Sequence, residues 1–300
     1  MAKTALCIGI NNYPGTDLDL GGCVNDAHDW AALLGGRGFK VTSLLDAAAT
    51  KAAMAEGMRR LIGGAAKGDL VVITFSGHGT FVPDTSGDEP DRQDEGLCPY
   101  DIQAGGGALI DDEIHQLFAA RKPGVKLVLI SDSCHSGTVT RTLGSEQPAD
   151  LPRRRFMPYA NWAAQGRATA PATPATPATP ATPAAPAAPA AAGVAKAAKV
   201  IARGRPPFKP ALAAHEGDLL LSGCEEGPNR FSYDTRFKGR PNGAFTYYAL
   251  KTLSEVEAAN PQATYADWHK AIAKALPTAS LPQRPQIVGT DAAKNARIFA

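Results

Sequence analysis

Two short segments carry the residue types needed for nucleophilic catalysis, Ser76-Gly77-His78-Gly79 and Asp132-Ser133-Cys134-His135. A cysteine thiol becomes a strong nucleophile when a nearby base takes its proton, and histidine is the commonest base. His135 is adjacent to Cys134 in the sequence, but neighbouring side chains of an extended chain point to opposite sides. We therefore expect His78 to be the base for Cys134, and His135 to have a packing or turn role.

Each of these segments follows a short apolar run, residues 69–75 before the first and 125–131 before the second. Runs of this kind alternate with helical patterns from residue 4 onward, which favours an α/β fold with a mostly parallel sheet and helices on both faces. Ligands of such sheets bind beyond the carboxyl ends of the strands. The two segments should therefore meet at one edge of the sheet.

The backbone of the same segments is expected to contribute to catalysis. Attack on a carbonyl group places negative charge on its oxygen, and backbone N–H groups can stabilise that charge. The N–H groups of Gly79 and Cys134 lie at the two strand ends and are the candidates for this oxyanion site. The glycines on either side of His78 allow the backbone to come close to a substrate.

The domain organisation follows from a change in composition. Residues 151–212 contain 12 of the 24 prolines and nine Lys or Arg but no Asp or Glu, in a chain of 300 residues with net charge +2. We interpret residues 151–212 as a largely disordered basic linker, flanked by residues 1–150 and by residues 213–300, which complete the same domain. Its charges are dispersed and it has few aromatic residues, so no nucleic-acid partner is expected.

The five cysteines include no CxxC pair and form no dense framework, which argues against zinc and structural disulfides. A reducing compartment is therefore expected. The first residues lack the apolar length of a signal peptide, and no apolar run is long enough to cross a membrane. We expect a cytoplasmic protein without a membrane partner.

The motifs FSGHG (75–79) and DSCHSG (132–137) resemble those of the metacaspases in the caspase-like clan of cysteine peptidases. The likeness extends to GCVNDA (22–27) and GRPNGAFTYYAL (239–250). It implies a caspase-type fold whose large-subunit and small-subunit parts form one domain, and we expect a monomer. It also implies a cysteine endopeptidase with His78 as base and Cys134 as nucleophile. The alternative is a catalytically silent interaction module of the same fold, but both catalytic residues are present.

The resemblance further implies that Asp26, Ser76 and Asp132 surround the pocket for the residue before the cleaved bond. Two carboxylates favour a cationic side chain, so we expect cleavage after Arg or Lys in peptide or protein substrates. Asp26 has an alternative role in stabilising the start of a helix. The basic residues on both sides of the Pro-Ala-Thr tract, near 153–167 and 196–205, then become expected sites of self-cleavage.

A calcium site is the remaining implication. The family places such a site at a double aspartate, here Asp111 and Asp112, together with an aspartate of an acidic loop, here Asp91 or Asp94. Oxygen-rich groups of this kind suit Ca²⁺. The peptidase chemistry itself is expected to need no cofactor. Ca²⁺ is a candidate activator only, because Arg141 stands where a further acidic ligand is expected. The two aspartates have an alternative role in starting a helix.

Overall fold

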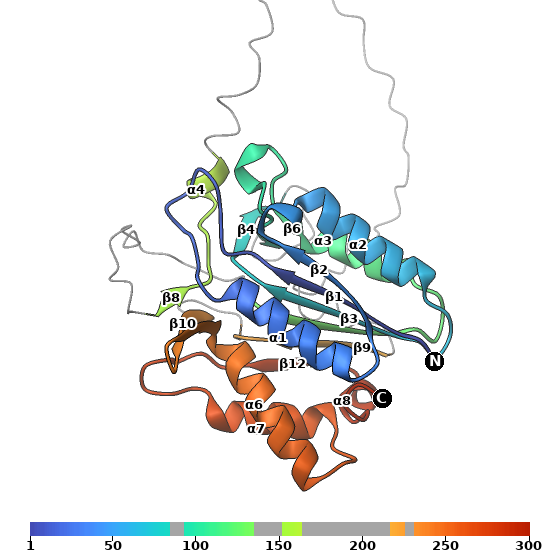
Figure 1. Ribbon diagram of the computed structural model, residues 1–300. Helices are drawn as coiled ribbons and strands as arrows, with labels where there is room; N and C mark the ends of the chain where they lie inside the picture. Colours follow the sequence, from blue (N-terminus) through green and yellow to red (C-terminus); the bar gives the residue numbers. More distant parts are fainter. Residues whose placement is uncertain (85–92, 135–151, 164–216, 226–230) are drawn as a thin grey trace, which may run out of the picture.

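A computed structural model describes residues 1–84, 93–134, 152–163, 217–225 and 231–300 (Figure 1). Its centre is a six-stranded sheet in the order β12-β9-β7-β3-β1-β2. The strands are β1 Lys3–Gly9, β2 Lys40–Leu45, β3 Leu70–Ser76, β7 Lys126–Asp132, β9 Asp218–Ser222 and β12 Gln286–Gly289. Only β12 among these six runs antiparallel to its neighbour. The expected mostly parallel sheet is confirmed.

Helices cover both faces of this sheet, as expected (Figure 1). One face carries α1 (Cys23–Gly36), α6 (Ala244–Ala259) and α7 (Tyr265–Ala275), whose side chains form one hydrophobic core with the sheet. The other face carries α2 (Lys51–Gly64) and α3 (Asp111–Ala119), which contribute to a second core. Burial on both faces explains why the central strands read as continuous apolar runs.

Local sequence signals fix several boundaries of these elements. All seven residues of β3 are buried, and β7 is buried after its first residue. The helix α2 begins after Thr50, whose side chain accepts a hydrogen bond from the N–H of Ala53. The helix α7 begins after Thr264, which forms a reciprocal capping box with Asp267. These caps satisfy N–H groups that the first helical turn leaves unpaired.

Two small antiparallel sheets lie beside the carboxyl edge of the main sheet. One consists of β4 (Gly79–Pro83), β5 (Gln93–Leu97) and β6 (Leu109–Ile110), and the other of β8 (Arg153–Arg154), β10 (Tyr233–Phe237) and β11 (Arg240–Gly243). The remaining short elements are α4 (Ala160–Ala163), α8 (Asp291–Lys294) and single 3₁₀ turns at Asp46–Ala48 and Ile102–Ala104. The strand β4 begins directly after His78, so the first small sheet starts at the candidate site.

Part of the expected linker is packed against the body of the protein. Residues 164–216 lie outside the described residues, but residues 152–163 are described, and Arg155, Phe156 and Met157 are buried. Two prolines interrupt this stretch in the sequence, so it shows no apolar periodicity, and its burial comes from contacts with distant segments. Beyond the linker, β9 pairs with β7 and joins the main sheet.

Within the described ranges, no helix combines the length and the apolar character needed to cross a membrane. The two ends of the chain lie near each other at the edge of the sheet opposite the candidate site (Figure 1), and Lys3 Nζ donates a hydrogen bond of 2.7 Å to the carbonyl oxygen of Phe299.

Candidate active site

The strands β3 and β7 bring the two catalytic candidates to neighbouring positions. These strands pair in parallel with Ser76 opposite Asp132, and His78 and Cys134 each follow two residues later. The N–H groups of Gly79 and Cys134 both donate hydrogen bonds to one oxygen, the backbone carbonyl of Arg155, at 3.0 and 3.2 Å. The two strand ends therefore converge on a single carbonyl group. His135, expected to have a packing role, lies outside the described residues.

The ring of His78 is buried and held in one orientation. Its Nε2 lies 2.6 Å from the carbonyl oxygen of Leu18. A carbonyl oxygen can only accept, so Nε2 carries the proton and Nδ1 keeps its lone pair. Among the described residues Nδ1 has no hydrogen-bond partner. The ring packs on Tyr13, with centroids 4.8 Å apart, and the Tyr13 hydroxyl accepts a hydrogen bond from the backbone N–H of His78.

Burial lowers the pKa of His78 to about 4, the hydrogen bond to Leu18 acts in the opposite direction, and the positive charge of Arg155 lowers it further. The imidazole is therefore neutral near pH 7, which is the form that can accept a proton. Burial also raises the pKa of the Cys134 thiol well above its ordinary value, assisted by the nearby thiol of Cys224. In this structure the pair rests as a neutral thiol and a neutral imidazole.

The side chain of Arg155 fills an acidic pocket beside these groups. Its Nη2 atom lies 2.7 Å from Asp26 Oδ2 and 2.8 Å from Asp234 Oδ1. Its Nη1 atom lies 3.2 Å from Asp132 Oδ2 and 3.1 Å from the carbonyl oxygen of Asp132. The guanidinium group is completely buried. Three carboxylates thus surround one cation, a set of charge-assisted contacts suited to the planar geometry of arginine.

Protein donors hold all three carboxylates in place. Asp26 accepts hydrogen bonds from the backbone N–H of Gly243 and the side-chain amide of Asn242. Asp132 accepts from the N–H and hydroxyl of Thr246 and from the hydroxyl of Ser232. Asp234 accepts from the N–H groups of Gly21 and Gly22. The carboxylates are therefore oriented by the scaffold as well as by the arginine.

The shape of this pocket depends on Gly243. A Cβ atom at this position would lie 2.5 Å from Arg155 Nη1 and would also collide with the carboxylate of Asp132. A side chain there would occupy the space that the guanidinium fills. Burial raises the pKa of the Asp26 carboxyl to about 7, a shift that the charge of Arg155 opposes and that of Asp132 increases.

The backbone around Arg155 runs through the site in an extended conformation. Arg153 and Arg154 pair antiparallel with Asp234 and Tyr233 of β10. The N–H of Arg155 donates to the carbonyl oxygen of Ser232 at 2.9 Å, and the N–H of Met157 donates to the carbonyl oxygen of Gly79 at 2.8 Å. Hydrogen bonds therefore hold the chain on both sides of the Arg155 carbonyl group, as in peptide recognition by addition of a strand.

The structure brings Asp26 and Asp132 together as expected from the sequence, and it places Ser76 beside Asp132, buried at the end of β3. Sequence reasoning missed Asp234. The sequence feature that could have indicated Asp234 is the alternating segment Tyr233–Phe237, which is too short to be recognised as a strand. It also missed the position of Arg155, because the basic run 153–155 was expected to lie in an exposed linker.

The expected calcium site stays a prediction, because one of its expected ligands lies outside the described residues. Asp111 and Asp112 are the first two residues of α3, as expected from their alternative role in starting a helix. The Glu113 side chain accepts a hydrogen bond of 3.1 Å from the N–H of Ile110 at the same end of the helix. Asp91 and Arg141 lie outside the described residues. Across the described parts of the chain, no group of three or more His, Cys, Asp or Glu side chains could hold a metal ion.

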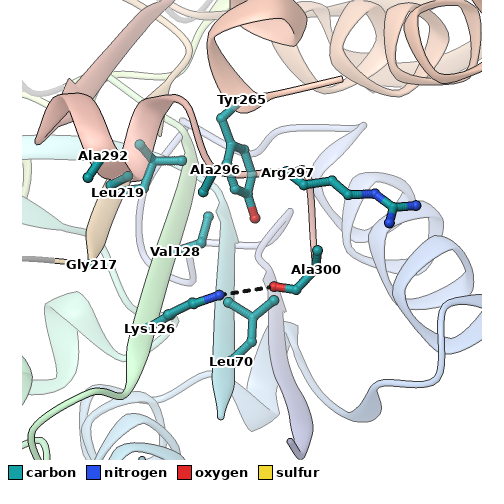
Figure 2. A pocket seen from close by; sticks show the side chains of 11 residues that line it. Leu70, Lys126, Val128, Gly217, Leu219, Tyr265, Ala292, Ala296, Arg297 and Ala300 are labelled. Carbon is teal, nitrogen blue, oxygen red and sulfur yellow. Dashed lines mark hydrogen bonds between the residues drawn. The ribbon is translucent and has the colours of Figure 1, made fainter. Parts of the chain in front are cut away.

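A separate cavity of about 190 Å³ lies at the opposite edge of the sheet (Figure 2). It is lined by the starts of β3, β7 and β9 and by the last residues of the chain, and Lys126 Nζ donates a hydrogen bond of 3.4 Å to the carbonyl oxygen of Ala300 across it. The amino ends of parallel strands are not where such sheets bind ligands. The edge that carries His78 and Cys134 is therefore the functional candidate.

Comparison with known proteins finds relatives that are named metacaspases. Metacaspase-1 of Cryptococcus neoformans is 41% identical over 147 residues, which are 45% of this chain and 32% of that protein. Metacaspase-7 of Arabidopsis thaliana is 40% identical over 147 residues, 46% of this chain and 35% of that protein. The matched part is thus about a third of the length of these relatives. Metacaspase-1 of Mycosarcoma maydis is 29% identical over 304 residues, 95% of this chain and 69% of that protein.

A solved structure of a protein from Geobacter sulfurreducens superimposes with a TM-score of 0.65 at 27% identity, covering 100% of this chain and 99% of that one. The family described as "Metacaspase, peptidase C14 domain" matches residues 3–142, the segment that contains β1 to β7 with both His78 and Cys134. Residues 3–142 of this chain are therefore similar in sequence to the metacaspase peptidase C14 domain.

Proposed function

We propose that the protein is a cysteine endopeptidase that hydrolyses peptide bonds after Arg or Lys. One observation carries this proposal: the side chain of Arg155 lies in the acidic pocket while its carbonyl oxygen accepts hydrogen bonds from the N–H groups of Gly79 and Cys134. A residue before a cleaved bond must satisfy both conditions at once. The specificity pocket and the oxyanion site are therefore at the correct separation for arginine.

In the proposed reaction, His78 Nδ1 accepts the proton of the Cys134 thiol as Sγ attacks the carbonyl carbon. The two N–H groups stabilise the negative charge that develops on the oxygen. His78 then donates its proton to the departing amine, which leaves a thioester between Cys134 and the substrate. A water molecule, deprotonated by His78, hydrolyses the thioester and restores the thiol. Because the Leu18 carbonyl oxygen keeps the proton on Nε2, Nδ1 is the nitrogen that accepts the proton of the thiol.

The acidic pocket supports selection of cationic residues. Arginine can bind Asp26, Asp132 and Asp234 together, and lysine can place one ammonium group among them. A substrate aspartate would bring a fourth carboxylate into the same buried space, where like charges repel strongly. The enzyme is therefore proposed to discriminate against acidic residues at this position.

The first substrate in this proposal is the chain itself. Arg155 is covalently part of the protein and already occupies the pocket, so attack by Cys134 is intramolecular and benefits from a high effective concentration. The bond between Arg155 and Phe156 is the one whose carbonyl group lies in the oxyanion site. Until that bond is cut or the segment moves out, it excludes other substrates.

The competing function is a catalytically silent module in which the segment serves as a permanent plug. An arginyl peptide ending in a thiol-reactive ketone separates the two, because it needs both the pocket and a reactive thiol. We expect mass spectrometry to find the probe on Cys134, and labelling to be lost in His78→Ala and in Asp234→Asn. A chain that stays unlabelled before and after prolonged incubation would favour the silent module.

A further inference from the structure

The residue that follows Arg155 is held as firmly as the arginine itself. Phe156 is 1% exposed and lies between two other aromatic rings. The ring of Phe81 stacks on it with centroids 5.8 Å apart, and the ring of Phe231 lies 6.3 Å away on a tilted plane. Cys134 belongs to the same buried cluster, so this aromatic contact is next to the attacking sulfur.

The walls of this cluster belong to the catalytic segments. Phe81 follows His78 by three residues on β4, whose first residue, Gly79, supplies one of the oxyanion N–H groups and bridges to Phe156. Phe231 directly precedes Ser232, whose carbonyl oxygen binds the N–H of Arg155. A substrate cannot use the oxyanion site without placing its next residue against these rings.

The same wall contacts the residue before Arg155. The guanidinium carbon of Arg154 lies 4.2 Å from the centre of the Phe231 ring, a cation–π contact. Side chains two positions apart on an extended chain point to the same side, so Arg154 and Phe156 meet Phe231 from either side of the reacting bond. One aromatic ring thus contacts the substrate on both sides of the cleavage point.

From this arrangement we infer that the site recognises the residue after the cleaved bond and prefers an aromatic one. The preferred substrate is a peptide in which two arginines precede an aromatic residue, with Phe81 and Phe231 as specificity-determining residues. This inference rests on the proposed peptidase function and adds the recognition of residues beyond the arginine.

Internally quenched peptides with the core Arg-Arg-X test it, with Phe, Leu, Ala or Asp at X and constant flanks. The assay uses the whole protein after self-cleavage is complete. Aromatic pairs contribute about 0.5–1.5 kcal/mol beyond their burial, so we expect kcat/KM for Phe to exceed that for Ala about threefold to tenfold. A second pair of peptides, Gly-Arg-Phe and Arg-Arg-Phe, tests the contact between the first arginine and Phe231. We expect kcat/KM for Arg-Arg-Phe to be about twofold to fivefold higher than that for Gly-Arg-Phe.

Variants assign the preference to the proposed rings. Phe81→Ala should bring the ratio of kcat/KM for the Phe peptide to kcat/KM for the Ala peptide close to one. Val82→Ala is the matched control, because Val82 follows Phe81 on β4 but packs on a different hydrophobic cluster. It should keep the wild-type ratio. If Phe81→Ala does not fold, Phe231→Leu replaces it and should lower both preferences.

Equal cleavage of all four X peptides would overturn the inference while leaving cleavage after arginine intact. A uniform loss in Phe81→Ala for every peptide would also overturn it, because a merely structural role damages all substrates alike. Failure to cleave any arginine peptide, with Cys134 unlabelled by the arginyl ketone, would instead overturn the proposed function and the inference with it.

Discussion

Arg155 and Asp26, 129 residues apart in the sequence, form an ion pair in which Nη2 lies 2.7 Å from Oδ2 and both side chains are completely buried. Removing two charges from water is costly, and breaking such a pair leaves an uncompensated buried charge. Here the loss of the arginine would leave Asp26 with two further carboxylates, Asp132 and Asp234. The pocket therefore needs a cation, supplied either by its own chain or by a substrate.

The first prediction concerns this competition between the segment and a substrate. In the inactive Cys134→Ala background, a fluorescent arginyl peptide should bind at least about tenfold more tightly when Arg155→Ala is added, because the pocket no longer has to release its own arginine first. Fluorescence anisotropy measures both dissociation constants. Arg154→Ala removes the cation–π contact with Phe231 but leaves Arg155 in the pocket, so as the comparison variant it should tighten peptide binding by no more than about fivefold. Unchanged affinity on removing Arg155 would show that the segment does not block the site.

The second prediction concerns the catalytic pair. Cys134→Ala and His78→Ala should each abolish self-cleavage, since one lacks the nucleophile and the other the base. His135→Ala should keep a measurable share of the activity. Gel densitometry over time gives the three rates. Substantial cleavage by the His78 variant would contradict the assignment of the base. An equal loss of the cleavage rate in His135→Ala and His78→Ala would contradict the claim that only His78 is needed as the base.

The third prediction concerns the carboxylates. Asp234→Asn can keep an oxygen at the place of Oδ2, which accepts from Gly21 and Gly22, but it replaces Oδ1, the partner of Arg155, with an uncharged amide nitrogen and so removes one negative charge from the pocket. We expect KM for an arginine peptide to rise by about tenfold or more, and the melting temperature to fall by less than in Asp132→Ala. Steady-state kinetics and calorimetry together test this. A wild-type KM in this variant would remove Asp234 from the binding site.

Asp132 should behave differently from Asp234. The carboxylate of Asp132 accepts hydrogen bonds from the N–H and hydroxyl of Thr246 at 2.9 and 2.8 Å. These bonds join β7 to the start of α6, and their loss would leave buried donors unpaired. We therefore expect Asp132→Ala to lower activity and to lower the melting temperature more than Asp234→Asn does.

The fourth prediction concerns pH. Burial lowers the pKa of His78 to about 4 when the segment is in place, so the neutral, basic form persists as the pH falls. The rate constant of self-cleavage should stay level down to about pH 5, more than one unit below the ordinary histidine value of about 6.5. Burial raises the pKa of Asp26 to about 7, so protonation below that value should weaken binding of a separate peptide and raise its KM. An acid limb of self-cleavage near pH 6.5 would contradict the buried environment of His78.

Much of this site could be predicted from the sequence because its residues sit at the ends of strongly apolar strands. The runs before His78 and Cys134 identify β3 and β7, and the alternation of side chains separates His78 from His135 as the base. The N–H groups of Gly79 and Cys134 were predicted for the same reason, since a strand end exposes its backbone to a ligand.

The remaining parts depend on contacts between distant segments. Asp234 reaches the pocket through the short strand β10, and Thr246 fixes Asp132 across 114 residues of sequence. Arg155 and Phe156 lie in a proline-interrupted stretch without apolar periodicity, so no local pattern distinguishes them from a solvated linker. Their burial follows from an acidic pocket and an aromatic cluster that are assembled by other elements.

The most direct test of the account is the position at which the chain is cut. Purified protein is incubated and its fragments are measured by intact-mass spectrometry, with Cys134→Ala treated in parallel. The account predicts two fragments, 1–155 and 156–300, in the wild type and an uncut chain in the variant. Cuts confined to the basic residues of 164–216, or the same fragments in both proteins, would contradict the claim that Arg155 is bound as the residue before the cleaved bond.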